Sequence, residues 1–338
     1  MRNIFSFPIA CFFAVTSVFA LQNVALKHPP PTYSEVRQTF APLDEVFDSP
    51  KNPITAQKVD LGRMLFFDKR FSKNRDLSCN SCHPLEKYGV DHTPVSVGFA
   101  GKTGKRNAPT VYNAAGHFTE FWDGRAPDVE QQAKGPVLNP IEMAMPNKGA
   151  VVAILKSVPG YVDAFRSAFP GEKDAVSYDN FGKAIGAFER KLTTPSRWDD
   201  YLRGDQSALT AEEQAGLQKF VSYGCSDCHE GILVGGQKFE KLGQAVPWPD
   251  QSDPGRSKVS RQNGDEMKFK VPSLRNVAET APYFHNGSGA NLETAVRLMG
   301  KHQLGIQLSD ADISSLIAFL KSLTGKIPAD YIKEPTLP

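Results

Sequence analysis

The sequence predicts an all-α fold made of two domains in tandem, joined by long loops. The chain has 338 residues, which is too long for one small core and suits about two domains. Apolar residues recur at helical spacing in several segments, and no segment shows the strict alternation of a half-buried strand. One short cysteine motif occurs in each half of the chain. These observations favour two helical domains of related construction.

The repeated motif is C-x-x-C-H, in which a histidine directly follows the second of two cysteines. The first box comprises Cys79, Cys82 and His83, and the second comprises Cys225, Cys228 and His229. In such a box the two thiols can form thioethers to the vinyl groups of a haem, and the adjacent imidazole can bind the iron. The sequence therefore predicts two covalently bound c-type haems, with His83 and His229 as proximal ligands.

A zinc site is the alternative interpretation of two cysteine pairs, because four thiolates can hold a structural zinc ion. Such a site needs the pairs to lie close in the fold, whereas here they lie in opposite halves of the chain. Zinc also needs no histidine directly after each second cysteine. The fifth cysteine, Cys11, falls in a segment that we expect to be removed. Haem attachment would then use every remaining cysteine and leave none for a disulfide.

Residues 1–20 have the composition of a secretory signal peptide. The start is positively charged, residues 4–19 form a short apolar run, and Ala20 ends it with a small residue. A membrane anchor is one alternative, but the run is short and contains Pro8. Lipidation at Cys11 is another, but residues 8–11 make a poor lipoprotein signal. We predict cleavage after Ala20, export to the periplasm and no stable insertion into a membrane.

The composition and charge resemble those of an ordinary globular protein. Hydrophobic residues make up 40% of the chain and charged residues 22%. The formal net charge is only +2, and no basic run is interleaved with aromatic residues. We therefore expect no nucleic acid among the partners.

The first domain is predicted to span residues 21–195. Residues 21–54 are rich in proline and lack periodicity, so we expect an extended strap over the surface. Thr55 is the expected N-cap of a helix over residues 56–67, just before the first haem box. After that box, glycine and proline punctuate a long loop between residues 91 and 110.

Helices are expected in the rest of the first domain. A short one is predicted around residues 128–134, and two more over residues 147–169, broken at Pro159-Gly160. A later helix presents one apolar stripe, made by Phe181, Ile185, Phe188 and Leu192. Thr193-Thr194-Pro195 ends this helix and marks the predicted domain boundary.

The second domain, residues 196–338 with a C-terminal tail, has the layout of a small cytochrome c. A capping box at Thr210 opens a helix that leads directly into the second haem box. Asn291 caps a helix that runs to Met299, and Ser309 caps a last amphipathic helix. We therefore predict an all-α chain of two tandem cytochrome c-like haem domains with long loops.

The ligand on the far side of each iron decides whether that haem transfers electrons or binds a small molecule. For the second haem the candidates are Met267 and Met299, although methionine is more often a core residue. Met299 lies late in the same domain, and a thioether ligand raises the reduction potential. For the first haem, Glu142 in a loop could move protons over an open iron. The simpler interpretation of Glu142 is a solvated charge.

Several short strings occur in a characteristic order along residues 60–320. They include Arg106-Asn107-Ala108-Pro109-Thr110, Phe121-Trp122-Asp123-Gly124-Arg125, Asn139-Pro140-Ile141-Glu142-Met143 and Pro282-Tyr283-Phe284-His285-Asn286-Gly287. Together with the haem boxes, they resemble the bacterial di-haem cytochrome c peroxidase family. The resemblance implies an enzyme that reduces hydrogen peroxide to water. It also implies a small periplasmic electron donor, either a cytochrome c or a cupredoxin, and a homodimer.

The resemblance further implies a role for individual residues around the haems. The haem on His83 would be the low-potential peroxidatic one, and the haem on His229 and Met299 would receive electrons. Glu142 corresponds to the acid/base that takes a proton from peroxide and returns it to the leaving oxygen. Gln132 corresponds to the polar partner beside it.

Four more positions correspond to family sites between the two domains. Trp122, which would otherwise be interpreted as a core residue, corresponds to the tryptophan between the haems. Asn107, Thr280 and Pro282 correspond to positions that hold a calcium ion, the last two through backbone carbonyls. Oxygen ligands of this kind suit Ca²⁺.

One position departs from the family pattern. Many members carry a Ser-x-Gly-His string whose histidine blocks the peroxidatic iron until the other haem is reduced. Here the string is Ser96-Val97-Gly98-Phe99, and phenylalanine cannot bind iron. His92 could replace it only through a different loop path. We therefore hypothesise that the first haem is open in the oxidised protein, so that activity needs no reductive activation.

Two other functions compete with a peroxidase. A MauG-like oxidase of a protein side chain, as in methylamine dehydrogenase maturation, also lacks the blocking histidine. Those enzymes replace the methionine ligand by tyrosine, however, and Met299 argues against this function. A di-haem electron carrier without catalysis would require both irons to be six-coordinate.

Overall fold

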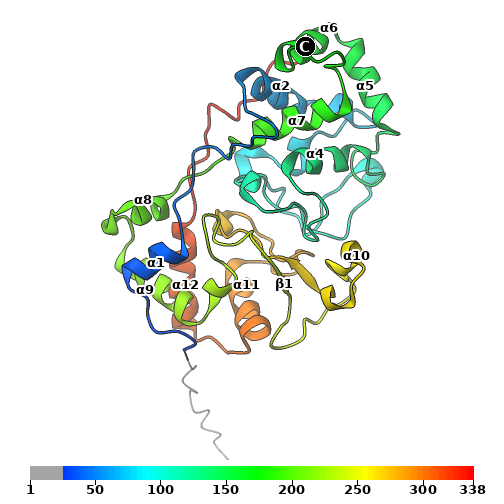
Figure 1. Cartoon of the computed structure of the whole chain (residues 1–338). Coiled ribbons are helices and arrows are strands. Elements are labelled where there is room, and N and C mark those ends of the chain that lie inside the picture. Colours follow the sequence, from blue (N-terminus) through cyan, green and yellow to red (C-terminus); the bar gives the residue numbers. More distant parts are fainter. Residues whose placement is uncertain (1–25) are drawn as a thin grey trace, which may run out of the picture.

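The computed structural model describes residues 26–338, which form two helical lobes (Figure 1). The predicted signal peptide and Cys11 lie outside the described residues. The helices are α1 (Tyr33–Thr39), α2 (Ala56–Phe67), α3 (Cys79–Cys82), α4 (Val129–Leu138), α5 (Lys148–Ser157), α6 (Pro159–Ala168), α7 (Tyr178–Glu189), α8 (Arg197–Arg203), α9 (Ala211–Ser222), α10 (Ser257–Ser260), α11 (Leu292–Leu298) and α12 (Asp310–Ser322). The first lobe contains α2 and α4 to α7, and the second contains α8, α9, α11 and α12. The predicted all-α fold is confirmed. A short antiparallel pair, β1 (Phe239–Lys241) with β2 (Lys268–Lys270), adds to it.

The core of the first lobe lies where α2 packs across α7. Thr55 caps α2 as predicted, by accepting a hydrogen bond from the backbone amide of Lys58. The predicted apolar stripe of α7 is buried, and Phe181 and Phe188 are both in the core. Gly62 allows the close approach of the two helices, because a Cβ there would lie 2.0 Å from a carbonyl oxygen of α7.

The core of the second lobe lies between α9 and α12. Both helices begin at the predicted capping boxes, headed by Thr210 and Ser309. Phe319 of α12 contacts Trp198 and Phe220 edge-on or tilted, with ring centroids 5.3 and 5.2 Å apart. The second haem box follows α9 directly, so this core fixes its position.

The N-terminal segment of the described chain packs on the second lobe, and the C-terminal tail packs on the first lobe. Val36 and Phe40, in and just after α1, are buried in the core of the second lobe. Tyr331 of the C-terminal tail stacks on Phe188 of the first lobe at 5.1 Å, and the C-terminus lies beside α6 (Figure 1). The expected surface strap is therefore wrong for α1, whose capping box at Thr32 is a local signal that the proline-rich composition concealed.

Other elements differ from expectation in their bounds. Helix α4 begins after Asp128 as predicted, but it continues through Pro136 to Leu138. Pro159 occupies the first turn of α6, where a missing amide donor is not needed, so the break falls at Val158. Helix α8 was not predicted, because its seven residues are too few for a clear period.

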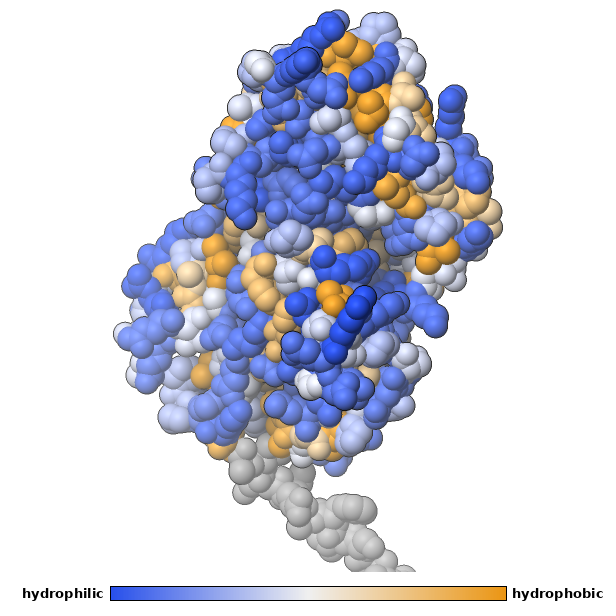
Figure 2. Space-filling model, turned by 45° about the vertical axis from the view of Figure 1, so that its right-hand side comes forward, coloured by the Kyte–Doolittle hydropathy of each residue, from blue (hydrophilic) through white to orange (hydrophobic). Residues whose placement is uncertain are grey.

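The surface of the molecule is mainly polar on the face that Figure 2 shows. Hydrophilic residues predominate there, and hydrophobic residues form small separate patches. Within residues 26–338, no helix combines the length and the apolar composition that crossing a membrane requires.

Candidate haem and catalytic site

The first haem box forms the short helix α3, and His83 ends it. Cys79 and Cys82 are three residues apart on this helix, so their thiols lie on one side. The backbone amide of His83 donates to the carbonyl oxygen of Cys79 at 2.9 Å. Ring Nδ1 lies 3.1 Å from the carbonyl oxygen of Gly89, so Nδ1 carries the hydrogen and Nε2 keeps a lone pair for iron. Burial lowers the pKa of His83, which favours the neutral, metal-binding imidazole.

The second haem box begins with a 3-10 turn, Cys225–Asp227, directly after α9. The backbone amide of His229 donates to the carbonyl oxygen of Cys225 at 3.0 Å. Burial lowers the pKa of His229 to about 4, so its ring is neutral at neutral pH. Gly235 lies against the ring, because a Cβ there would be 3.1 Å from Nδ1 of His229 and 2.2 Å from the carbonyl oxygen of Pro272.

The donor set of each box fits a c-type haem. The four thiols are free, and each box adds one imidazole that burial keeps neutral. Cys79 packs against the core of the first lobe and Cys225 against the core of the second. The two cysteine pairs therefore belong to different lobes, which is incompatible with one shared zinc site.

The candidate methionine ligands of the second iron lie in one small hydrophobic cluster. Met299 ends α11 and begins a π-helical turn, Met299–Leu304. It packs against the buried residues Trp248, Met267 and Phe269. The geometry brings both candidates together, and the choice of Met299 stays a prediction.

A cavity of about 470 Å³ lies beside α4 in the first lobe. It is lined by Phe121, Arg125, Ala126, Pro127, Gln131, Gly135, Pro136, Asn139 and Glu142. The predicted acid/base, Glu142, therefore faces a space large enough for a small substrate. Gln132 is not among these lining residues, whereas Gln131 is. Adjacent positions on a helix point about 100° apart. The sequence alone therefore does not show which of the two glutamines faces the cavity.

The carboxylate of Glu142 is oriented and electrostatically tuned by its neighbours. Its Oε1 accepts a hydrogen bond from the side-chain amide of Asn139 at 2.8 Å. Burial raises the pKa of Glu142, and the positive charge of Arg125 opposes this rise. A carboxyl group with a raised pKa is suited to accept a proton and return it. Arg125 was not a predicted site residue, although it ends the Phe121-Trp122-Asp123-Gly124-Arg125 string.

Phe99 stands in a tight loop that is pressed against the backbone of Glu142. Its amide donates to the carbonyl oxygen of Glu142 at 2.8 Å. Lys73 and Lys102 lie over its ring, 5.0 and 5.6 Å from the centroid. His92 is exposed, and its Nδ1 lies 3.0 Å from the carbonyl oxygen of Ala281. His92, the histidine nearest to Phe99 in the described part of the chain, therefore contacts the backbone of the second lobe.

Trp122 is half-buried where the two lobes meet. Its Nε1 donates to the carbonyl oxygen of Asn107 at 2.9 Å. Its own carbonyl accepts a hydrogen bond from the amide of Lys270 at 2.8 Å, and its ring lies edge-on to His285 at 6.5 Å. This residue therefore has contacts with both haem-bearing lobes.

The three predicted calcium positions lie around the loop of residues 92–94. The side-chain amide of Asn107 donates to the carbonyl oxygen of Thr93 at 2.9 Å. His92 contacts Ala281, which stands between Thr280 and Pro282. The loop thus brings the first-lobe and second-lobe positions to one region, and the calcium ion itself stays a prediction.

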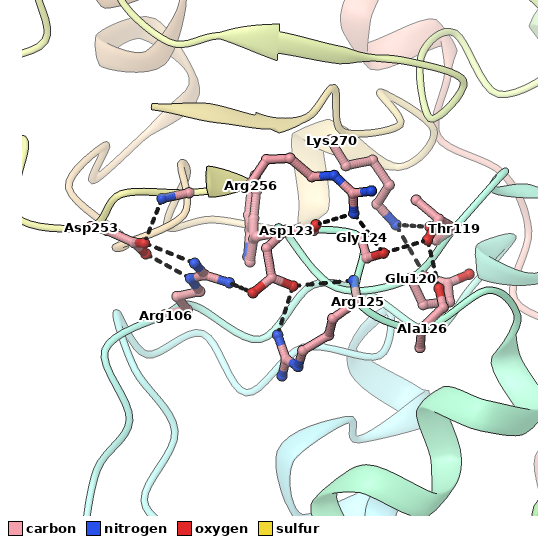
Figure 3. Close-up of polar contacts among 12 residues, drawn as sticks. Arg106, Thr119, Glu120, Asp123, Gly124, Arg125, Ala126, Asp253, Arg256 and Lys270 are labelled. Carbon is pink, nitrogen blue, oxygen red and sulfur yellow. Dashed lines mark hydrogen bonds and ion pairs between the residues drawn. The ribbon is translucent and has the colours of Figure 1, made fainter. Parts of the chain in front are cut away.

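Charged residues around Asp123 form contacts across the lobe boundary (Figure 3). Arg106 donates two hydrogen bonds to Asp253 of the second lobe, at 2.6 and 2.8 Å, and a third to Asp123 at 2.6 Å. Arg256 of the second lobe donates to the carbonyl oxygens of Asp123 and Gly124 at 2.9 and 3.0 Å. Sequence reasoning missed these pairs, because their members are far apart along the chain.

Known proteins share both the sequence and the fold of this chain. A family model described as di-haem cytochrome c peroxidase matches residues 56–207. The chain is 45% identical to cytochrome c551 peroxidase of Pseudomonas aeruginosa, over 90% of this chain and 89% of that protein. It is 33% identical to methylamine utilization protein MauG of Methylorubrum extorquens, over 85% and 83%.

A solved structure supports the same relationship. The chain is 31% identical to a MauG-like protein associated with microbial copper homeostasis, with a TM-score of 0.76, covering 87% of this chain and 96% of that one. Two haem boxes in separate helical lobes, and high identity over nearly the whole length, agree with the resemblance seen in the sequence motifs. The chain therefore belongs to the di-haem cytochrome c peroxidase family.

Proposed function

We propose that this protein is a cytochrome c peroxidase that reduces hydrogen peroxide to water with electrons from a small redox protein. The observation that carries the proposal is Glu142, a carboxyl group of raised pKa that faces a cavity in the lobe of the first haem box. The 45% identity to a cytochrome c551 peroxidase supports the same chemistry.

The residues of the first lobe would manage the protons of this reaction. Haem bound at the first box supplies the iron at which peroxide is reduced, and haem at the second box supplies the incoming electrons. The Glu142 carboxylate accepts a proton from peroxide and then returns it to the oxygen that leaves as water. Asn139 holds the carboxylate by its hydrogen bond. In total, peroxide takes up two electrons and two protons and gives two waters.

The second lobe would deliver electrons. We propose Met299 as the second axial ligand of its haem, and Trp122 as the aromatic contact between the lobes. A small periplasmic cytochrome c or cupredoxin would be the donor, and the predicted signal peptide supports a periplasmic location. We also propose a calcium ion at Asn107, Thr280 and Pro282, and a homodimer, as the family resemblance implies.

The first haem is proposed to be open in the oxidised protein. Phe99 cannot bind iron, and its loop is tied to Glu142 by a backbone hydrogen bond. His92 contacts the backbone of Ala281. We expect cyanide to bind the fully oxidised protein without prior reduction. Low-spin, six-coordinate spectra for both ferric haems, with no cyanide binding, would contradict this proposal.

The proposed function is tested by peroxide turnover with a reduced cytochrome c. Glu142→Gln should lower the rate by a factor of about 10² to 10⁴, the usual contribution of a general acid/base. The exposed Glu212 offers a matched control, and Glu212→Gln should keep the rate. Soret absorbance checks that both haems are retained. Absence of turnover in every protein would favour the electron carrier instead.

A further inference from the structure

The cavity beside α4 carries two opposite charges. Glu142 and Arg125 both line it, and the seven other lining residues are uncharged (Phe121, Ala126, Pro127, Gln131, Gly135, Pro136 and Asn139). The charge of Arg125 acts on Glu142, because it opposes the rise in the pKa of that carboxyl group. An anion or a polar substrate in this space would therefore meet a guanidinium group as well as the acid/base.

The guanidinium of Arg125 is held at the cavity by two contacts. It lies over the ring of Phe121, with Cζ 3.4 Å from the ring centroid. Its Nη1 donates to Oδ1 of Asp123 at 2.9 Å, as Figure 3 shows. A guanidinium has five N–H donors, so most of them stay available to a ligand. The side chain keeps 42% of its surface exposed, so a small ligand can reach the guanidinium where it lies.

The position of Arg125 is also tied to the second lobe. The carboxylate of Asp123 is shared between Arg125 and Arg106, and Arg106 makes a two-pronged contact with Asp253. These residues form a continuous chain of ion pairs from the second lobe to the edge of the cavity (Figure 3). Such a chain restricts where the guanidinium can lie when the cavity is filled.

We propose that Arg125 is a catalytic residue, the cationic partner of Glu142 in peroxide reduction. This inference rests on the proposed function. When the O–O bond breaks, the leaving oxygen gains an electron pair and receives the proton that Glu142 had taken from peroxide. The guanidinium donates hydrogen bonds to this oxygen and stabilises the negative charge before the proton arrives. The leaving oxygen becomes the first water in this way. The other oxygen of peroxide takes up two electrons, which the donor supplies through the haems, and two protons from solvent, and it becomes the second water.

Azide binding to the ferric holoenzyme tests the proposal without turnover. Azide is a small anion that would need the same guanidinium, so Arg125→Met should weaken its binding by about tenfold to a hundredfold, the range for a hydrogen bond to a charged group. Arg125→Lys keeps the positive charge but loses the planar set of guanidinium donors. Its azide affinity should lie between that of Arg125→Met and that of the unchanged protein.

Arg256→Met is the matched control. Arg256 also lies over a phenylalanine ring, Phe239, at 4.5 Å, and it also contacts Asp123, but it does not line the cavity. This variant should bind azide as the unchanged protein does. Soret and near-ultraviolet spectra confirm that each variant is folded and carries both haems.

The outcomes separate this inference from the proposed function. If azide binds Arg125→Met and Arg125→Lys as tightly as the unchanged protein, the inference is wrong even where peroxide turnover is present. If Arg125→Met loses haem or fold, Arg125→Lys carries the test, and an azide affinity equal to that of the unchanged protein then overturns the inference. If only the Arg125 variants lose azide affinity while no protein turns over peroxide, the anion-binding role of Arg125 stands and the proposed peroxidase function fails.

Discussion

Glu142 obtains its properties from neighbours that lie in separate segments of the chain. Asn139, three residues earlier, orients one carboxylate oxygen, and the amide of Phe99 fixes the backbone from another loop. Burial raises the pKa of Glu142, while Arg125 limits the rise. A single carboxyl group can thus be ionised when peroxide arrives and still hold a proton briefly afterwards.

The raised pKa of Glu142 predicts a pH dependence of the reaction. In the proposed mechanism the ionised form accepts the first proton, so kcat/KM for peroxide should fall as pH decreases through a pKa above the solvated glutamate value of about 4.3. Above that pKa the rate should be constant with respect to this group. Arg125→Met removes the opposing charge, so its acid limb should lie at higher pH. Steady-state rates over a buffer series provide the measurement, and coincident profiles for the two proteins would contradict the prediction.

Helix α8 shows how one element can join distant parts of the chain. Asp199, in its first turn, accepts hydrogen bonds from the backbone amides of Ser196 and Leu43 at 2.7 and 2.6 Å. It also pairs with Arg275 at 2.7 Å, and both side chains are almost completely buried. Arg275 in turn donates to the carbonyl oxygen of Ile232. The ion pair therefore connects the segment after α1, helix α8 and the loop behind the second haem box.

Removing one member of this buried pair should strongly destabilise the second lobe. Arg275→Met leaves Asp199 buried without its partner, so we expect a loss of about 3–5 kcal/mol in the free energy of unfolding. The control is Arg197→Met, since Arg197 is 53% exposed in its pair with Glu213, where about 0–1 kcal/mol is usual. Urea unfolding followed by the signal of the second haem measures both, and equal effects would disprove the prediction.

The same pair makes part of the stability dependent on acid. Burial alone would raise the pKa of Asp199, but the charge and hydrogen bond of Arg275, with backbone donors, lower it below its usual value. A carboxyl group whose folded pKa is lowered adds stability above its unfolded pKa of about 3.9, and this is lost as pH falls through the folded pKa. This loss of stability at acid pH should be absent from the Arg275→Met variant.

On the scale of the whole molecule, the N-terminal segment packs on the second lobe and the C-terminal tail packs on the first. Helix α1 supplies Val36 to the core of the second lobe. Three partly buried residues of the C-terminal tail, Ile327, Tyr331 and Ile332, pack against the core of the first lobe. The hydroxyl of Tyr331 also donates to the carbonyl oxygen of Phe188 at 2.7 Å. The domain division at residue 195 is a prediction that takes no account of these crossings.

Truncation of residues 327–338 should therefore loosen the first lobe and not the second. The mirror variant, Val36→Ala with Phe40→Ala, should loosen the second lobe and not the first. Amide hydrogen exchange resolved by peptide gives the protection of each lobe separately. If the truncation lowered protection in α9 and α12 while α2 and α7 stayed protected, the tail would have no role in the first core.

Local signals were sufficient for much of the fold and for part of the site. Thr55, Thr210 and Ser309 mark helix starts through hydrogen bonds to residues three positions away, so the sequence predicts them directly. The haem boxes are equally local. The expected surface strap failed at α1, because burial of Val36 depends on residues that come much later in the chain.

Parts of the candidate site had no local signal. The Arg106–Asp253 pair joins the two lobes, and neither residue indicates its partner in the sequence. Arg125 stands in a recognisable motif, but only the fold places it at one cavity with Glu142. Gln131 and Gln132 are adjacent on α4, and only the fold shows that Gln131 faces the cavity.

The crossing of the chain ends has a consequence for how the protein can be divided. A cut after residue 195 would give two fragments with one haem box each. The first would lack the tail residues Ile327, Tyr331 and Ile332 that pack on its core, and the second would lack Val36 and Phe40 of its core. We expect each fragment alone to have a weakened lobe, and a mixture of the two fragments to restore both sets of contacts. Mixing the two fragments, and not the separate expression of one of them, is therefore the way to study one haem box at a time.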